Sequence, residues 1–414
     1  MIKTICPSGV NGTLKAPASK SYAQRAIAAA LLADGESVLQ NIDLCDDISA
    51  AAGVAEALGA KVSVEGGNYV IKGGMSPVSG TLDIGESGLS TRLFTPIAAI
   101  CGRVMTITGH GSILSRPLSM MEQPLRELGA RISSNGGYLP IEIEGPLKGG
   151  DIEVDGSLSS QFISGLLFAL PLAQNNSTLR VKSLNSRPYI DMTLEVIRAF
   201  GVEIVNRDYE EFFIKGGQCY RPARYNVEGD WSGASCLLVA GAVAGKITVA
   251  NLNPESLQAD RAIVDALKMT GAIVTQNGNN ITVEKNSLRG FEFDATHCPD
   301  LFPALAVLAA NCQGESVITG TKRLANKESD RAKTITETFA RLSIDIDISR
   351  ENTMIIKGGP IQGGIVNSYN DHRIAMAAAV AALTSSAEVV IEDAQAVNKS
   401  YPGFWNDLSA ITGK

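Results

Sequence analysis

Histidines, aromatic residues and uninterrupted apolar segments are all scarce in this sequence. Only three of its 414 residues are histidine (His110, His297 and His372), which argues against a histidine-rich metal centre. Aromatic residues make up 5% of the chain, too few for the stacking platforms of proteins that bind single-stranded nucleic acid. Charges, glycines or prolines interrupt every apolar run before it reaches membrane-spanning length. We therefore expect no metal site, no nucleic-acid partner and no membrane partner.

The seven cysteines are scattered singly, and no two of them form a Cys-x-x-Cys pair. Their odd number and wide spacing argue against a disulfide framework or a zinc site, and they favour a reducing compartment. The first residues, MIKTICPSGVNG, lack the apolar core of a signal peptide. We therefore expect a cytoplasmic protein.

Length indicates two domains, and the composition fits a globular enzyme. A chain of 414 residues exceeds one ordinary hydrophobic core, so two domains are the default. Hydrophobic residues form 45% of the chain and charged residues 19%, which is typical of globular enzymes with large buried helices. Because the net charge is −7, an anionic ligand would need a local basic cluster.

One pattern recurs five times along the chain, on the order of 70 residues apart. Each copy ends a helix, continues as a strand of alternating residues, turns at polar residues and returns as a second strand. Since this period is too long for common solenoid repeats, we expect each copy to belong to a small α+β unit. The equivalent glycine-like positions that end the helices are Gly59, Gly129, Gly201, Gly271 and Ser343.

A sixth unit is implied at the two ends of the chain. The C-terminal segment from Ala387 supplies its strand and helix, and residues 1–17 offer the strand material that it lacks. Six units divide into three plus three, which predicts a continuous domain at 16–225 and a discontinuous domain made of 1–15 and 226–414. Two chain crossings would then join the domains around one cleft.

Six other stretches share a polar or glycine-rich start that runs into apolar helical sequence. Free backbone N–H groups and the positive end of the helix dipole favour an anion at such a start. For one helix alone, capping by Ser19 with solvated Lys20 and Arg25 is the simpler explanation, but six such starts indicate an anion site. They begin at Pro17, Gly85, Asp155, Gly229, Thr296 and Asn370.

Two charged motifs add candidates for chemistry. The motif NKESDRAKT (326–334) alternates in charge sign, which also fits a self-paired, solvated helix start. Asp371, His372 and Arg373 open an apolar helix, where an unpaired charge is costly unless it binds something. His372 fits a buried structural histidine as well as a functional one, whereas Arg373 is the better candidate for a carboxylate or phosphate fork.

A set of short motifs, each weak alone, is specific in its order and spacing. The motifs are Lys20-Ser21 with Arg25, Gly85–Arg92, Ser115-Arg116-Pro117, Ser159-Ser160-Gln161, Arg187–Asp191, Pro299-Asp300, Lys327–Arg331, Asn370–Arg373 and Lys399. Through them the sequence resembles the family of 5-enolpyruvylshikimate-3-phosphate synthases, the 3-phosphoshikimate 1-carboxyvinyltransferases. The resemblance covers essentially the whole chain.

This resemblance implies an α/β (α+β) fold of two domains, each built from three βαβαββ units, with the active site in the interdomain cleft. It implies an enzyme that moves the enolpyruvyl group of phosphoenolpyruvate onto the 5-hydroxyl of shikimate 3-phosphate and releases phosphate by addition and elimination. That reaction is a step of the shikimate pathway toward chorismate and the aromatic amino acids, and it uses no metal and no cofactor. The partners would be these two small molecules, and we expect a monomer.

The resemblance also implies roles for individual residues. Asp300 would accept a proton, Glu328 would donate one, and Lys20 would lie near the transferred proton. Two phosphates and two carboxylates together carry roughly −5 to −6 charges, which explains the many lysines and arginines. Shikimate 3-phosphate would be held by Lys20, Ser21, Arg25, Ser159, Ser160, Gln161, Ser186, Asp300 and Lys327. Phosphoenolpyruvate would be held by Lys20, Gly88, Arg116, Gln161, Arg331, Arg373 and Lys399.

The sequence departs from the family pattern at two places. The usual Gly-Asn-Ala-Gly-Thr reads Gly-Glu-Ser-Gly-Leu at 85–89, and Arg323 stands where asparagine is common. A carboxylate at about 4 Å from an anion would repel it by roughly 4 kcal/mol at an effective dielectric near 20. We therefore expect Glu86 to turn away from the site and pair with a nearby base.

Three other classes of protein fit parts of the pattern. The sister enzyme that acts on UDP-N-acetylglucosamine typically has a reactive cysteine in the loop that here reads HGSILSR (110–116), without cysteine. An RNA phosphate cyclase would need a nucleotide-binding histidine and more basic or aromatic surface. A sliding clamp would spread Lys and Arg along helices that line a DNA hole, whereas here they gather at helix starts and loops.

Overall fold

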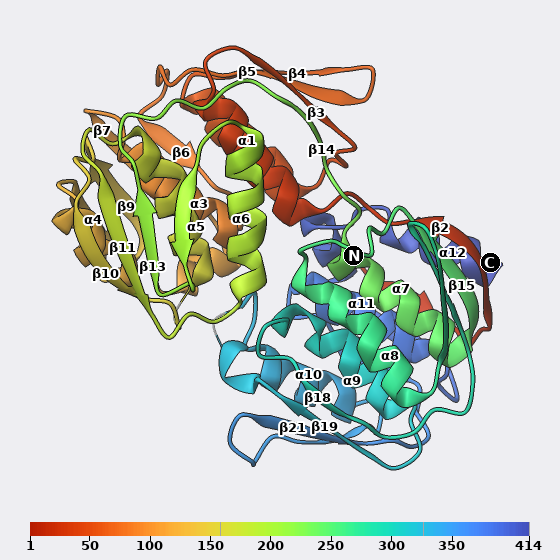
Figure 1. Cartoon of the computed structure of the whole chain (residues 1–414). Coiled ribbons are helices and arrows are strands. Elements are labelled where there is room, and N and C mark those ends of the chain that lie inside the picture. Colours follow the sequence, from red (N-terminus) through yellow and green to blue (C-terminus); the bar gives the residue numbers. More distant parts are fainter. Residues whose placement is uncertain (158, 326, 414) are drawn as a thin grey trace. The chain divides into compact units, whose positions relative to one another are not determined.

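The computed structural model describes the whole chain apart from Leu158, Asn326 and Lys414, and it divides into two compact units. Each unit has its own sheets and its own layer of buried helices (Figure 1). The units are the continuous unit, Lys20–Val227, and the split unit, Met1–Ser19 with Glu228–Lys414.

The continuous unit contains three four-stranded sheets with the same pattern of parallel and antiparallel neighbours (Figure 1, red to green). The strand orders are β14-β3-β5-β4, β6-β7-β9-β8 and β10-β11-β13-β12. In each sheet the first two strands run parallel, and a hairpin extends them antiparallel. The strands are β3 (Glu36–Gln40), β4 (Lys61–Glu65), β5 (Asn68–Lys72), β6 (Thr81–Asp83), β7 (Val104–Thr108), β8 (Arg131–Asn135), β9 (Tyr138–Glu144), β10 (Asp151–Asp155), β11 (Ser177–Lys182), β12 (Ile204–Arg207), β13 (Glu211–Ile214) and β14 (Arg224–Asn226).

Helices supply the crossovers that parallel strands require. α3 connects β6 to β7, α5 connects β10 to β11, and both are buried on almost every side, so they form an inner layer. A Cβ on Gly165 of α5 would lie 2.3 Å from the carbonyl oxygen of Arg92, so glycine there lets α5 approach the backbone of α3. The helices of this unit are α1 (Lys20–Leu32), α2 (Asp46–Ala57), α3 (Gly88–Ala98), α4 (Glu122–Glu127), α5 (Ser160–Ala169) and α6 (Arg187–Ala199).

The split unit builds its sheets from both ends of the chain. The strand orders are β16-β17-β15-β2, β18-β19-β21-β20 and β1-β23-β22. β1 pairs antiparallel with β23 in the last sheet, whereas β2 pairs parallel with β15 in another sheet, so only the first of the two N-terminal strands joins the last unit as the sequence predicted. The strands are β1 (Lys3–Ile5), β2 (Val10–Lys15), β15 (Gly245–Ala250), β16 (Ile273–Asn277), β17 (Asn280–Glu284), β18 (Glu292–Asp294), β19 (Glu315–Thr319), β20 (Asp345–Asp347), β21 (Thr353–Lys357), β22 (Gly364–Asn367) and β23 (Val389–Glu392).

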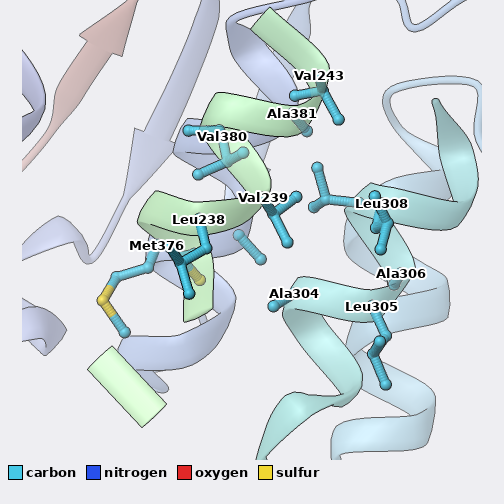
Figure 2. Close-up of a cluster of buried hydrophobic side chains, with 14 of the residues drawn as sticks. Leu238, Val239, Val243, Ala304, Leu305, Ala306, Leu308, Met376, Val380 and Ala381 are labelled. Carbon is cyan, nitrogen blue, oxygen red and sulfur yellow. The ribbon is translucent and has the colours of Figure 1, made fainter. Parts of the chain in front are cut away.

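Three alanine-rich helices form the interior of the split unit. α7, α9 and α11 pack against one another, and Figure 2 shows their buried side chains, among them Val239, Leu305 and Val380. None of the helices in the described part of the chain is long and apolar enough to cross a membrane. The helices of this unit are α7 (Trp231–Ala244), α8 (Ile263–Thr270), α9 (Phe302–Ala310), α10 (Arg331–Ala340), α11 (His372–Ala382) and α12 (Phe404–Thr412).

The five repeated sequence patterns form five hairpins, as predicted: β4-β5, β8-β9, β12-β13, β16-β17 and β20-β21. The predicted glycine-like positions before them all adopt left-handed backbone, with φ between +60° at Ser343 and +109° at Gly59. Glycine reaches this conformation without steric cost, which is why four of the five positions carry it.

Candidate active site

The starts of α9, α10 and α11 bring a charged cluster together within the split unit. Asp300 lies in the turn Pro299–Leu301 that leads into α9, Arg331 begins α10, and Arg373 is the second residue of α11. The Asp300 carboxylate lies 2.6 Å from Arg331 Nη1, 3.2 Å from Lys327 Nζ and 3.4 Å from Arg373 Nη2. Four predicted site residues therefore meet at one carboxylate.

Arg331 is the centre of this cluster and is completely buried. Besides Asp300, its guanidinium contacts the carboxylates of Glu328 at 2.5 Å and Asp371 at 2.9 Å. Asp371 also accepts the backbone N–H of Arg373 at 3.0 Å and so caps α11. Burial alone would lower the pKa of Arg331, but its three carboxylate neighbours outweigh burial and raise that pKa well above its ordinary value.

The surrounding cations decide the protonation of Asp300. Burial alone would raise the pKa of Asp300, but the charges of Arg373, Lys327 and Arg331 hold it well below the usual range. The carboxylate is therefore ionised at neutral pH, yet it is a weak proton acceptor while these cations surround it. Ligands that draw the cations away would make it a stronger base.

Asp260 is a buried carboxylate beside this cluster that the sequence analysis missed. It lies in the turn Ala259–Ala262 before α8 and accepts a hydrogen bond from the hydroxyl of Ser232. Burial, followed by the negative charge of Asp300, raises the pKa of Asp260 to about 6. No local motif marks this residue, because only the packing of α8 against α7 and α9 places it near Asp300.

Replacing Asp260 with asparagine should change how the stability of the split unit depends on pH. The folded-state pKa of about 6 exceeds the ordinary value of 3.8, so ionisation of Asp260 destabilises the fold as the pH rises through that interval. Relative to Asp260→Asn, the wild type should lose roughly 3 kcal/mol of unfolding free energy between about pH 4 and pH 7. Trp231 and Trp405, the two tryptophans, both lie in the split unit, so their fluorescence during urea unfolding measures this. A difference between the two proteins that stays constant with pH would contradict the prediction.

In the continuous unit, two predicted ligands at the start of α1 bind protein groups. Lys20 Nζ lies 2.9 Å from the carboxylate of Asp47. Arg25 is buried and donates to the carbonyl oxygen of Ser21 at 2.9 Å and to the hydroxyl of Thr193 at 2.9 Å. Burial lowers the pKa of Arg25 to about 10, so the side chain is still charged at neutral pH. The polar start of α1 is therefore built into the fold and is not a solvated cap.

A second group of predicted ligands surrounds the start of α3. Arg116 is buried, and its guanidinium lies against Gly88, where a Cβ would come within 2.3 Å of Arg116 Nη1. Arg92 donates to the carbonyl oxygen of Gly88 at 3.1 Å and to Gln161 Oε1 at 3.3 Å. Gly88, Arg116 and Gln161 are thus brought together, and Arg92 links them, a role that the sequence analysis did not assign.

Three predicted serine ligands also lie at helix starts. Ser159 precedes α5, and Ser160 is its buried first residue. Ser186 precedes α6 with a φ of +57°, a left-handed conformation that is uncommon for serine. Its buried hydroxyl has no hydrogen-bond partner within the described part of the chain. Backbone strain and an unsatisfied buried hydroxyl are costs that cluster at ligand sites.

The remaining candidates are Lys399, which ends the 3₁₀ turn Ala394–Lys399, and residues at the start of α11 or outside the described residues. Lys399 donates to the carbonyl oxygen of Asn370 at 2.7 Å, and His372 is buried as the first residue of α11. Asn326, the first residue of the charged motif, is outside the described residues. Across residues 1–157, 159–325 and 327–413, no group of three His, Cys, Asp or Glu side chains is placed to hold a metal ion.

Comparisons with known proteins agree on one family. The family model for EPSP synthase (3-phosphoshikimate 1-carboxyvinyltransferase) matches residues 6–408. A 3-phosphoshikimate 1-carboxyvinyltransferase of Clostridium perfringens is 39% identical over 99% of this chain and 98% of its own length, and one of Clostridium kluyveri is 38% identical over 99% and 97%. EPSP synthase from Acinetobacter baumannii has a similar solved structure, with a TM-score of 0.83 and 27% identity over 99% of this chain and 98% of that chain. The enolpyruvyl transferase NikO from Streptomyces tendae shares the fold, with a TM-score of 0.79 and 16% identity over 99% and 97%.

Proposed function

Because the chain belongs to the EPSP synthase family, we infer that its charged clusters bind that family's two substrates. The chain is an enzyme with the family's two-domain fold, and it transfers the enolpyruvyl group of phosphoenolpyruvate to shikimate 3-phosphate. This is a step of the shikimate pathway, which leads to the aromatic amino acids. The roles of individual residues, the domain boundaries and the course of the reaction are our proposals.

We propose a continuous domain at 16–225 on the shikimate 3-phosphate side and a discontinuous domain, 1–15 with 226–414, on the phosphoenolpyruvate side. The division of the structure after Ser19 and Val227 supports these boundaries to within a few residues. We propose further that the protein acts as a cytoplasmic monomer that binds no nucleic acid. Its seven cysteines are all free thiols, which fits a reducing compartment.

In the proposed site, shikimate 3-phosphate binds at the starts of α1, α5 and α6, with Asp300 and Lys327 near its reacting hydroxyl. The charged and hydroxyl side chains at these starts, including the unsatisfied Ser186, support this assignment. Phosphoenolpyruvate binds the cations Arg116, Arg331, Arg373 and Lys399, with Lys20, Gly88 and Gln161. Arg116 and Arg373 are both buried, and a buried cation favours an anionic partner.

The proposed reaction has an addition step and an elimination step. In the addition, the 5-hydroxyl gives its proton to Asp300, its oxygen bonds to C2 of phosphoenolpyruvate, and Glu328, which must enter this step in its protonated form, gives a proton to the methylene carbon. In the elimination, the new methyl group returns a proton to the Glu328 carboxylate, the double bond re-forms, and the bond from C2 to the phosphate oxygen breaks, which releases phosphate. No electrons are transferred to an outside acceptor, so acid–base groups suffice.

One observation carries this proposal: Asp300 shares its carboxylate with Lys327, Arg331 and Arg373. The phosphate and carboxylate of phosphoenolpyruvate would compete with Asp300 for these cations, because both are strong acceptors for arginine and lysine. Weaker pairing would raise the pKa of Asp300 toward the range in which a carboxylate acts as a base. Binding of phosphoenolpyruvate would thus activate Asp300 as the base that deprotonates the 5-hydroxyl of shikimate 3-phosphate.

The activity is tested by phosphate release. The purified protein should release phosphate from phosphoenolpyruvate only when shikimate 3-phosphate is added, and excess chelator should not change the rate. UDP-N-acetylglucosamine is the matched control acceptor, because the sister enzyme uses it in the same kind of transfer. Release with that acceptor, and none with shikimate 3-phosphate, would overturn the proposed function.

A further inference from the structure

Glu86 joins the turn before α3 to the loop that carries Arg116. Its carboxylate accepts the backbone N–H of Ser112 at 2.8 Å. The backbone N–H of His110 donates to the carbonyl oxygen of Gly85 at 3.0 Å, so a second hydrogen bond joins the loop to the same turn. The loop and the turn are therefore fastened to each other at two points.

Close packing accompanies the hydrogen bond. Gly111 has a φ of +63°, and a Cβ at this position would lie 2.3 Å from the carboxyl carbon of Glu86. The carboxylate thus rests directly on the backbone of the loop at the start of the short 3₁₀ turn Gly111–Ser115. A side chain one methylene shorter would not reach the same amide without movement of the loop.

Arg116 lies at the far end of this turn. Its backbone N–H donates to the carbonyl oxygen of Ile113 at 3.1 Å, so the 3₁₀ turn fixes the position of the Arg116 backbone. Its buried guanidinium lies against Gly88, the first residue of α3. A cation at the positive end of a helix dipole is unfavourable by itself. An anion bound there would be stabilised by the guanidinium and by the dipole.

We propose that Glu86 is a positioning residue for phosphoenolpyruvate binding: it holds the 110–116 loop through the N–H of Ser112, and the loop holds Arg116 against Gly88. This inference rests on the proposed role of Arg116 as a phosphoenolpyruvate ligand. The carboxylate suits the task, because a hydrogen bond from an N–H to a charged acceptor is stronger than one to a neutral amide. Glu86 itself does not touch the substrate.

The test compares Glu86→Ala and Glu86→Gln with Arg116→Ala and with Glu127→Ala, a control at an exposed glutamate of the same unit. Glu86→Ala should raise KM for phosphoenolpyruvate about tenfold, with kcat and KM for shikimate 3-phosphate within about twofold of wild type. Glu86→Gln should recover most of the affinity, because its amide oxygen still accepts the N–H of Ser112. Glu127→Ala should leave all three constants unchanged.

Two further measurements separate positioning from general damage. Glu86→Ala combined with Arg116→Ala should be no worse than Arg116→Ala alone, because the two residues act through one guanidinium. Hydrogen exchange should become faster at residues 110–116 in Glu86→Ala and should stay unchanged in the split unit.

The possible failures are distinct. If Arg116→Ala leaves KM for phosphoenolpyruvate unchanged, the proposed role of Arg116 is wrong, and the inference on Glu86 falls with it. If Arg116→Ala raises that KM and Glu86→Ala does not, only the inference on Glu86 is wrong. If Glu86→Ala lowers kcat and raises both KM values by similar factors, and Glu86→Gln does not recover them, the role of Glu86 is merely structural. That outcome would also overturn the inference on Glu86.

Discussion

Asp300→Asn is expected to lower kcat by about 10²- to 10⁴-fold, while the affinity for shikimate 3-phosphate stays within about threefold of wild type. Asparagine keeps the shape of the side chain but cannot accept a proton, so the loss falls on the step in which the 5-hydroxyl is deprotonated. Steady-state kinetics give kcat, and calorimetric titration with shikimate 3-phosphate gives the affinity. The two readouts together separate a base from a residue that only binds.

The matched control for this prediction is Asp294→Asn. Asp294 lies six positions before Asp300, is exposed, and accepts the backbone N–H of Thr296 at 2.9 Å. Its replacement should leave kcat unchanged. If Asp300→Asn retained kcat within about fivefold of wild type, Asp300 would not be the base, and the proton would have to go to another group of the cluster.

Arg331→Met should destabilise the split unit by about 3–5 kcal/mol and abolish activity. The guanidinium is completely buried and pairs with three carboxylates, of which Asp371 is itself completely buried. Removing one partner from a buried ion pair leaves charge that neither water nor another group solvates, and this costs far more than loss of a surface pair. Tryptophan fluorescence during urea unfolding should show a lower midpoint, because both tryptophans lie in this unit.

Lys322→Met is the control for the loss of charge. Lys322 pairs with Glu351 at 2.6 Å, but both side chains are more than half exposed, so its replacement should cost less than about 1 kcal/mol. Arg331→Lys should fall between the two, since one ammonium cannot reproduce the bonds of the guanidinium fork. A shift of the unfolding midpoint for Arg331→Met no larger than that for Lys322→Met would refute the central role of Arg331.

Local patterns explain what the sequence could predict of the fold. An alternating strand, a polar turn and a second strand form a hairpin from contacts within about twenty residues, so all five hairpins were predictable. The helix starts were predictable for the same reason, because capping and apolar composition act within one or two turns. The pairing of β14 with β3 was not predicted: it joins Tyr225 to Leu39, and no local pattern marks two strands so far apart.

The features of the candidate site also divide into those that the sequence determines and those that depend on packing. The sequence by itself determined the family and which side chains stand at the helix starts, Lys20, Ser160, Arg331 and Arg373 among them, because residue type and position along the chain suffice for that. Only the tertiary structure decided that Arg331 joins Asp300 to Asp371, that Asp260 lies beside them with a raised pKa, and that Glu86 turns to the N–H of Ser112. These facts depend on burial and on distances between segments far apart in the chain, and both arise only when the helices pack.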